Sequence, residues 1–170
     1  ARCADDRPRE HRLAGRLREL GVVAPPLEQL AAQCEVIALC VTADADVLAT
    51  IDTMLPHLKR GAVVVDHSTV APDTAKRAAA RLATAGVDFL DAPVSGGVEG
   101  AKNGKLSVMV GGDAAVLERA RPVLEAYALR VTHLGDVGAG QATKAVNQVL
   151  VAGIAQAVCE GLALGEALGL

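Results

Sequence analysis

The sequence has almost no aromatic residues: one phenylalanine, one tyrosine and no tryptophan among 170 residues. Proteins that bind single-stranded nucleic acid stack bases on aromatic rings, so that activity is not expected here. An excess of positive charge is also lacking, because the net charge is −3, which argues against a basic face for a phosphate backbone. Hydrophobic residues nevertheless make up 51% of the chain, and they predict a core built from Ala, Val, Leu and Ile.

Cysteine occurs without the spacing that metal or redox sites require. The four cysteines are scattered along the chain, at Cys3, Cys34, Cys40 and Cys159. We expect reduced thiols and no metal site, as is typical of a cytoplasmic protein. Arginines are frequent near the N-terminus, but Asp5, Asp6 and Glu10 lie among them and no apolar segment follows. Neither a signal peptide nor a transit peptide is therefore predicted.

Long hydrophobic runs are missing as well. The longest uncharged run covers residues 145–159 and is interrupted by Asn147, Gln148 and Gln156. A membrane-spanning helix needs about 20 predominantly apolar residues. The run therefore predicts a buried helix, and no membrane partner is expected.

Short runs rich in aliphatic residues alternate with helical patterns along the chain. The predicted strands are Glu35–Val41, Ala62–Asp66, Val87–Asp91, Leu106–Val110 and Val131–Leu134. The predicted helices are Pro8–Leu20, Pro26–Gln33, Ala45–Leu58, Pro72–Ala85, Ala114–Ala128 and Gln141–Leu168. Strands that are apolar along their whole length are covered on both faces, and their alternation with helices is typical of α/β folds. We predict a Rossmann-type, mostly parallel sheet.

The last helix differs from the others. Aliphatic residues recur every four positions from Val146 to Leu162, beside a stripe of small residues that would let another helix approach closely. We interpret it as the first long helix of an all-helical domain, with residues 1–138 forming the α/β domain and residues 139–170 beginning the next. The Gly-x-Gly-x-x-Gly turn that opens dinucleotide-binding folds is not found before Glu35. We therefore expect a chain truncated at both ends and inactive alone.

A glycine-rich loop follows the third predicted strand, where Ser95, Gly96 and Gly97 come after Asp-Ala-Pro-Val. Ligands in open α/β sheets bind at the carboxyl ends of strands. Two glycines let backbone amides approach a carboxylate, and the Ser95 hydroxyl can donate a further hydrogen bond. The alternative is a tight turn without a ligand.

A second cluster lies at the start of the last helix. Lys144, Asn147 and Gln148 are separated by three and four residues, so all three are expected on one side of the helix. The uncharged residues that follow Lys144 favour a buried amine able to serve as a general acid or base. The alternative is an ordinary surface lysine.

These two segments resemble the β-hydroxyacid dehydrogenase family, which includes 3-hydroxyisobutyrate dehydrogenases and tartronate semialdehyde reductases. The first is Asp-Ala-Pro-Val-Ser-Gly-Gly-x-x-Gly-Ala-x-x-Gly-x-Leu-x-x-Met-x-Gly-Gly at 91–112, and the second is Gly138-x-Gly140-x-x-x-Lys144-x-x-Asn147. The resemblance implies that Ser95, Gly96 and Gly97 hold the substrate carboxylate and that Lys144 moves the proton. Many relatives carry asparagine where this chain has Gln148. Asn147 is therefore interpreted as the functional amide and Gln148 as a secondary contact.

The resemblance also implies an NAD or NADP site. Asp66-His67-Ser68-Thr69 resembles a family element in which Thr69 faces the nicotinamide, although such a segment is also a common helix cap. Val41 and Thr42 fall where relatives have Leu-Pro against the cofactor, and the threonine is a departure from that pattern. Asp5 would accept the ribose hydroxyls and favour NAD over NADP, unless it is only a charge near a helix start.

The function that the resemblance implies is an NAD(P)-dependent oxidoreductase that interconverts a small 3-hydroxy acid and its semialdehyde. The substrate is expected to be an unphosphorylated carboxylate, because the glycine-rich loop lacks a cluster of cations. A homo-oligomer is expected at full length. The alternative from another class is a non-catalytic, dehydrogenase-like module that binds a ligand or a partner.

Overall fold

The computed structural model describes Glu19, Gly21, Val22 and residues 25–170. Helix Pro8–Leu20 and Asp5 therefore fall, apart from Glu19, outside the described residues. The described helices are α2 (Leu27–Gln33), α3 (Asp44–Met54), α4 (Pro72–Ala83), α5 (Gly97–Lys102), α6 (Ala114–Leu124) and α7 (Ala139–Ala167), with a 3-10 turn at Leu55–His57. The described strands are β1 (Val36–Leu39), β2 (Val63–Asp66), β3 (Asp88–Asp91), β4 (Val94–Ser95), β5 (Leu106–Val110) and β6 (Ala128–His133).

The strands form two small sheets joined at one point. In the first, β1, β2 and β3 are all parallel, with Val36 opposite Val63 and Val64 opposite Phe89. In the second, β4 is antiparallel to β5, and β5 is parallel to β6. A bridge between Asp91 and Gly111 joins them. The predicted α/β class with a mostly parallel sheet is confirmed, but β4 and α5 were not predicted.

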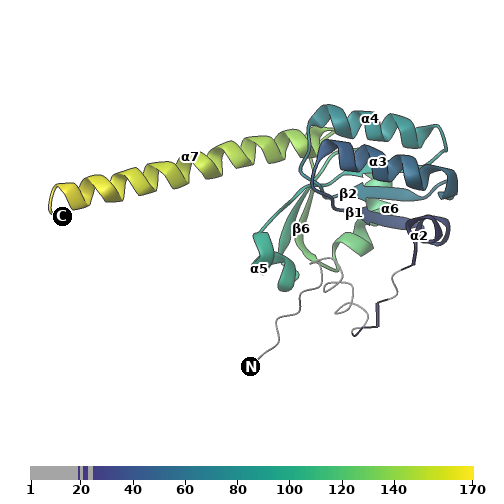
Figure 1. Ribbon diagram of the computed structural model, residues 1–170, viewed down its shortest axis with the longest axis horizontal. Coiled ribbons are helices and arrows are strands. Elements are labelled where there is room, and N and C mark those ends of the chain that lie inside the picture. The colour runs from purple at the N-terminus through teal and green to yellow at the C-terminus, as the bar shows by residue number, and fades with distance from the viewer. Residues whose placement is uncertain (1–18, 20, 23–24) are drawn as a thin grey trace, which may run out of the picture.

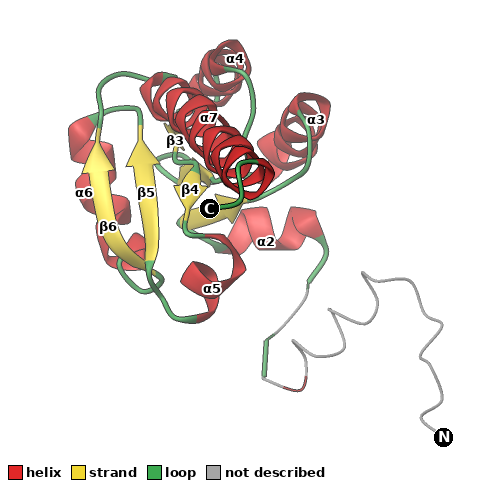
Figure 2. Cartoon of the chain, turned by 90° about the vertical axis from the view of Figure 1, so that its left-hand side faces the viewer, coloured by secondary structure: helices red, strands yellow, loops and turns green. Residues whose placement is uncertain are grey.

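The core lies on both faces of the first sheet. Val64 of β2 belongs to a buried cluster with α3 and α4, whereas its neighbours Val63 and Val65 belong to a second cluster with α6. Successive side chains of a strand point to opposite faces, so a strand covered on both sides must be apolar throughout. Figure 2 shows α3 and α4 on one side of the domain and α6 on the other.

Local capping sets where the helix after β5 begins. Asp113 precedes α6, and its Oδ1 accepts hydrogen bonds from the amides of Ala115 and Val116, at 2.8 and 3.0 Å. These amides have no partner inside the helix, so an N-cap carboxylate satisfies them.

Helix α7 projects from the α/β domain as a single rod (Figure 1). Its buried residues are Gly140, Gln141 and Lys144, all in the first two turns. The run 145–159, predicted to be buried, is exposed in this chain apart from the half-buried Asn147. By length and apolar composition alone, α7 is also a helix that could cross a membrane. Its first turns, however, pack on the α/β domain, and those turns position the site described next.

Candidate functional site

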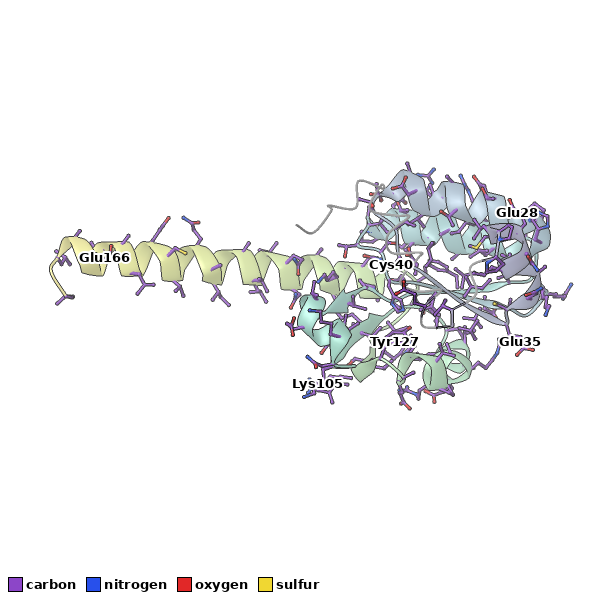
Figure 3. The ribbon with its side chains drawn as sticks, turned by 60° about the horizontal axis from the view of Figure 1, so that its bottom comes forward. Glu28, Glu35, Cys40, Lys105, Tyr127 and Glu166 are labelled. Carbon is purple, nitrogen blue, oxygen red and sulfur yellow. The ribbon has the colours of Figure 1, made fainter. Side chains whose placement is uncertain are left out.

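A cavity of about 800 Å³ lies beside the first turns of α7. Five of the predicted site residues line it, namely Ser95, Gly96, Gly97, Lys144 and Gln148. The cavity is also lined by Cys40, His67 and Tyr127, which the sequence did not single out. In Figure 3, Cys40 and Tyr127 lie near the end of the domain from which α7 projects, whereas Glu28 and Glu35 lie at the far end.

The buried carboxylate of Asp91 fixes the start of α7 to the end of β3. Its Oδ1 accepts a hydrogen bond from the Gly138 amide at 2.7 Å, and its Oδ2 accepts one from the Gln141 amide at 2.9 Å. Amides of a helix's first turn have no intrahelical acceptor, and a carboxylate there also opposes the positive end of the helix dipole. One acidic side chain therefore ties the first turn of α7 to the end of β3.

The side chain of Gln141 makes a second connection, to the segment that follows β2. Its Nε2 donates to the Ser68 carbonyl at 2.7 Å, and its Oε1 accepts from the Val70 amide at 3.2 Å. Gln141 is 1% exposed, so both bonds are made without competition from water. The first turn of α7 is thus held to the ends of β2 and β3 together.

Lys144 follows one turn later, on the same side of α7 as Gly140 and Gln141. It is 9% exposed, and its Nζ donates to the Val94 carbonyl at 2.8 Å. Val94 immediately precedes Ser95, so the amine lies against the entrance of the glycine-rich loop. Among the described residues Lys144 forms no ion pair, which leaves its remaining N–H groups free for a ligand.

The glycine-rich loop itself requires glycine. Gly96 and Gly97 have φ values of 129° and 60°, in a region that side chains with a Cβ rarely adopt. A Cβ on Gly96 would also lie 3.3 Å from a methyl group of Leu106. At Gly96 and Gly97 the loop therefore presents backbone to the cavity beside Lys144, next to the side chain of Ser95.

The two amides that follow Lys144 face different cavities. Gln148 lines the large cavity with Lys144, whereas Asn147 lines a neighbouring one of about 310 Å³. Ser95 lines both. The Asn147 Nδ2 donates to the Gln148 Oε1 at 3.0 Å. Lys144 and Gln148 thus line one cavity and Asn147 the other, and the two amides are in contact with each other.

The residues expected to face a cofactor lie at the carboxyl ends of β1 and β2. Thr42 and Thr69 are exposed, and Val41 is half-buried. The Val41 amide donates to the Ser68 hydroxyl at 2.9 Å, so it is not free for a ligand. Two exposed hydroxyl side chains thus follow adjacent parallel strands, at the edge of the sheet where dinucleotides bind in such folds.

His67 and Tyr127 are the site residues that sequence reasoning missed. His67 directly follows β2, which is where ligands bind in such sheets, and that position was the available signal. Tyr127 is the sole tyrosine of the chain, but it lies in the α6–β6 connection, where nothing in the local pattern indicates a cavity.

The last residue of β2 is an aspartate whose carboxyl group is buried. Asp66 is fully buried, and its Oδ1 accepts from the Ser68 amide at 2.9 Å. Its Oδ2 has no hydrogen-bond partner among the described residues. Burial, reinforced by the nearby Asp91 carboxylate, raises the pKa of Asp66 above its ordinary value of 3.8. The charged form is therefore destabilised in the folded protein.

Asp66→Asn is expected to raise the free energy of unfolding near neutral pH by about 1–3 kcal/mol. Because the folded-state pKa exceeds the unfolded one, the folded protein binds more protons, and its stability falls as the pH rises past 3.8. The uncharged asparagine keeps an acceptor for the Ser68 amide, so its advantage should be full at neutral pH and vanish in acid. Urea denaturation of the full-length protein measures this. Asp66→Ala, which removes the acceptor, should lose stability, and equal stability of Asp66→Asn and wild type at neutral pH would contradict the argument.

Comparison with known proteins places this geometry in a family. Residues 7–135 match the NAD binding domain of 6-phosphogluconate dehydrogenase. An NAD-dependent L-serine dehydrogenase of Pseudomonas aeruginosa is 45% identical over 119 residues, which are 70% of this chain and 40% of the relative. The 2-hydroxy-3-oxopropionate reductase of Escherichia coli is 44% identical over 65% of this chain and 38% of its own length.

A solved structure agrees with this match. The 3-hydroxyisobutyrate dehydrogenase of Mycobacterium tuberculosis, whose structure includes L-serine, superposes with a TM-score of 0.82 and 37% identity. The match covers 84% of this chain and 49% of the mycobacterial one. The chain thus spans half or less of the length of these relatives. It belongs to the β-hydroxyacid dehydrogenase family and carries the NAD-binding domain of the 6-phosphogluconate dehydrogenase type.

Proposed function

We propose that the full-length protein interconverts a small, unphosphorylated 3-hydroxy acid and its semialdehyde with NAD or NADP. The observation that carries this proposal is the placement of the Lys144 amine. It is buried, 2.8 Å from the Val94 carbonyl, and lines one cavity with Ser95, Gly96 and Gly97. An amine beside a carboxylate-binding loop is the arrangement that proton transfer on a small hydroxy acid requires.

Each residue of the cavity has a separate task. The Ser95 hydroxyl and the backbone of Gly96 and Gly97 bind the carboxylate and fix the acid. In the oxidation direction Lys144 accepts the proton of the substrate hydroxyl, and in reduction it returns that proton to the nascent alkoxide. A bound nicotinamide would supply the hydride chemistry at the carbon that carries this hydroxyl. Because the cofactor supplies the redox chemistry, the protein contributes mainly orientation and proton transfer.

In this proposal the side-chain amide of α7 that contacts the substrate belongs to Gln148. Its side chain lines the Lys144 cavity, and the Asn147 Nδ2 occupies its Oε1 at 3.0 Å. We propose that the Gln148 Nε2 donates to a ligand oxygen and that Asn147 acts by holding Gln148. This reverses the roles that the sequence suggested for the two residues.

Charge in the cavity favours an unphosphorylated acid. Among the described lining residues Lys144 is the sole lysine or arginine. The phosphate of a phosphorylated sugar acid adds up to about two negative charges, for which proteins supply clustered arginine or lysine side chains. One cation suits one carboxylate together with one hydroxyl.

The cofactor is proposed to bind along Thr42 and Thr69, with its nicotinamide end toward Lys144. Asp5, on which the preference for NAD rests, lies outside the described residues, so that preference stays a prediction. Titration of the full-length protein with NADH and with NADPH, followed by cofactor fluorescence, measures it. Tighter binding of NADH is expected.

The proposed function is tested by steady-state absorbance with the full-length protein, NAD+ or NADP+, and glycerate, L-serine or 3-hydroxyisobutyrate. At least one acid should be oxidised, and 6-phosphogluconate should not. Ser95→Ala should raise the KM for the acid about tenfold, because a hydrogen bond to a charged group is lost. Absence of turnover with every acid, and with the corresponding semialdehydes and NADH, would refute the proposal and favour a binding module.

A further inference from the structure

Residues 92–94 lead into the glycine-rich loop, and each of their three carbonyl groups accepts a hydrogen bond. The Ala92 carbonyl accepts from the His67 Nδ1 at 2.6 Å, and the Pro93 carbonyl accepts from the Met109 amide at 3.0 Å. The Val94 carbonyl accepts from the Lys144 Nζ at 2.8 Å. Two of these three donors are side chains that line the cavity. The approach to Ser95 is therefore held by the pairing of β4 with β5 and by two cavity side chains, His67 and Lys144.

His67 is itself held in one orientation. A carbonyl oxygen can only accept, so the Nδ1 of His67 carries the proton, and in the neutral ring the Nε2 must accept. The Tyr127 hydroxyl lies 2.7 Å from that Nε2 and therefore donates to it. The two rings also make an edge-to-face contact, with centroids 5.5 Å apart. Tyr127, His67 and the Ala92 carbonyl thus form a chain of hydrogen bonds with a fixed direction.

Burial keeps both members of this chain in the required protonation state. Burial lowers the pKa of His67 from 6.5, so the ring is neutral at neutral pH. Burial raises the pKa of Tyr127 from 10.0, so the hydroxyl retains its proton. Both ring nitrogens of His67 are already engaged, one with the Ala92 carbonyl and one with the Tyr127 hydroxyl, so the pair is suited to hold a neighbour in place.

We propose that His67 and Tyr127 are positioning residues for the glycine-rich loop, which binds the substrate carboxylate through Ser95, Gly96 and Gly97. The proposal rests on the proposed function. The Lys144 amine is shared between the Val94 carbonyl and the substrate, so it serves both proton transfer and the loop. His67, supported by Tyr127, serves only the approach to the loop. The pair acts on substrate binding through the backbone and takes no part in proton transfer.

Three substitutions in the full-length protein test this role. Tyr127→Phe keeps the ring and removes the hydroxyl, and His67→Leu removes the donor to Ala92. His67→Asn places an amide nitrogen near the position of Nδ1, so it can restore that donor. We expect His67→Leu to raise the KM for the acid about tenfold, Tyr127→Phe to raise it less, and His67→Asn to recover most of the loss. The kcat and the affinity for NADH should stay within about threefold of wild type. His57→Leu, at an exposed histidine remote from the cavity, is the matched control.

Amide hydrogen exchange gives a readout that does not depend on turnover. The Met109 amide, which donates to the Pro93 carbonyl, should exchange about tenfold faster in His67→Leu than in wild type and recover in His67→Asn. The Gly138 amide, bound to Asp91, should not change. Unaltered Met109 exchange in both Tyr127→Phe and His67→Leu would overturn the proposal. If His67→Leu does not fold, the exchange rate of the Met109 amide in Tyr127→Phe alone tests the proposal. This measurement can be made even if the protein shows no turnover, so it is separate from the test of the proposed function.

Discussion

Lys144→Met is expected to lower the kcat/KM of the full-length protein for its 3-hydroxy acid by about 10²–10⁴-fold. Methionine fills a similar volume and tolerates burial, so the cavity should keep its shape. The variant lacks any group that can take the hydroxyl proton or return it. Because the lost interaction acts on the transferred proton, most of the decrease should be in kcat rather than KM. Initial rates of NADH formation at saturating cofactor measure it.

Two further lysine variants control for charge and for general effects. Lys105→Met removes an exposed lysine close to the glycine-rich loop and should leave kcat/KM within about twofold of wild type. Lys144→Arg keeps the positive charge but cannot release a proton in the accessible pH range, so it should be nearly as impaired as Lys144→Met. An active Lys144→Arg variant would show that the site needs charge only. Retention of more than a tenth of wild-type activity by Lys144→Met would remove the proposed acid–base role.

The strands that position the site could be predicted because a strand that is buried on both faces is apolar along its whole length. The segment at β2 is apolar on both faces for this reason, with Val64 in one cluster and Val63 and Val65 in the other. The glycine-rich loop and Lys144 could be identified for a different reason. Backbone with positive φ needs glycine, and a lysine amid uncharged residues is unusual in a soluble helix.

The parts that could not be predicted depend on tertiary contacts. α5 is a six-residue helix that contains two glycines, and local propensity opposes it. The Lys105 amide closes it by donating to the Gly100 carbonyl at 2.7 Å. The contact between His67 and Tyr127 joins residues 60 positions apart. No pattern in the sequence around either residue indicates this contact.

Helix geometry explains why Asn147 and Gln148 separate. Residues advance by about 100° around a helix, so Gln148 lies about 40° to one side of Lys144 and Asn147 about 60° to the other. Spacings of three and four both count as the same side in a sequence pattern. Ser95 lines both cavities, so the two amides can lie on the same side of the helix and still face different spaces. The pattern therefore located the helix face but could not assign the two amides.

Gly140→Ala is expected to destabilise the full-length protein by at least about 3 kcal/mol, because α7 packs on the sheet with no room for a methyl group. A Cβ on Gly140 would clash with the Met109 carbonyl and lie 2.7 Å from the Asp91 carbonyl and 2.9 Å from its carboxylate. These are mainly backbone atoms, so the helix itself would have to move. Such a shift would weaken the bonds from the Gly138 and Gln141 amides to Asp91. Thermal and urea denaturation measure the loss.

The same displacement should carry Lys144 away from the glycine-rich loop. Gly140 and Lys144 are one turn apart on one face of α7, and a misplacement of about 1 Å can cost about 10²-fold in rate. Folded Gly140→Ala protein should therefore lose activity as well as stability. Ala142→Gly is the matched control, because Ala142 is exposed on the opposite side of the same turn of α7. It should lose only about 0.5–1 kcal/mol from helix propensity and keep its activity. If Gly140→Ala cost no more stability than Ala142→Gly and stayed active, the close contact between α7 and the sheet could not be what places the lysine.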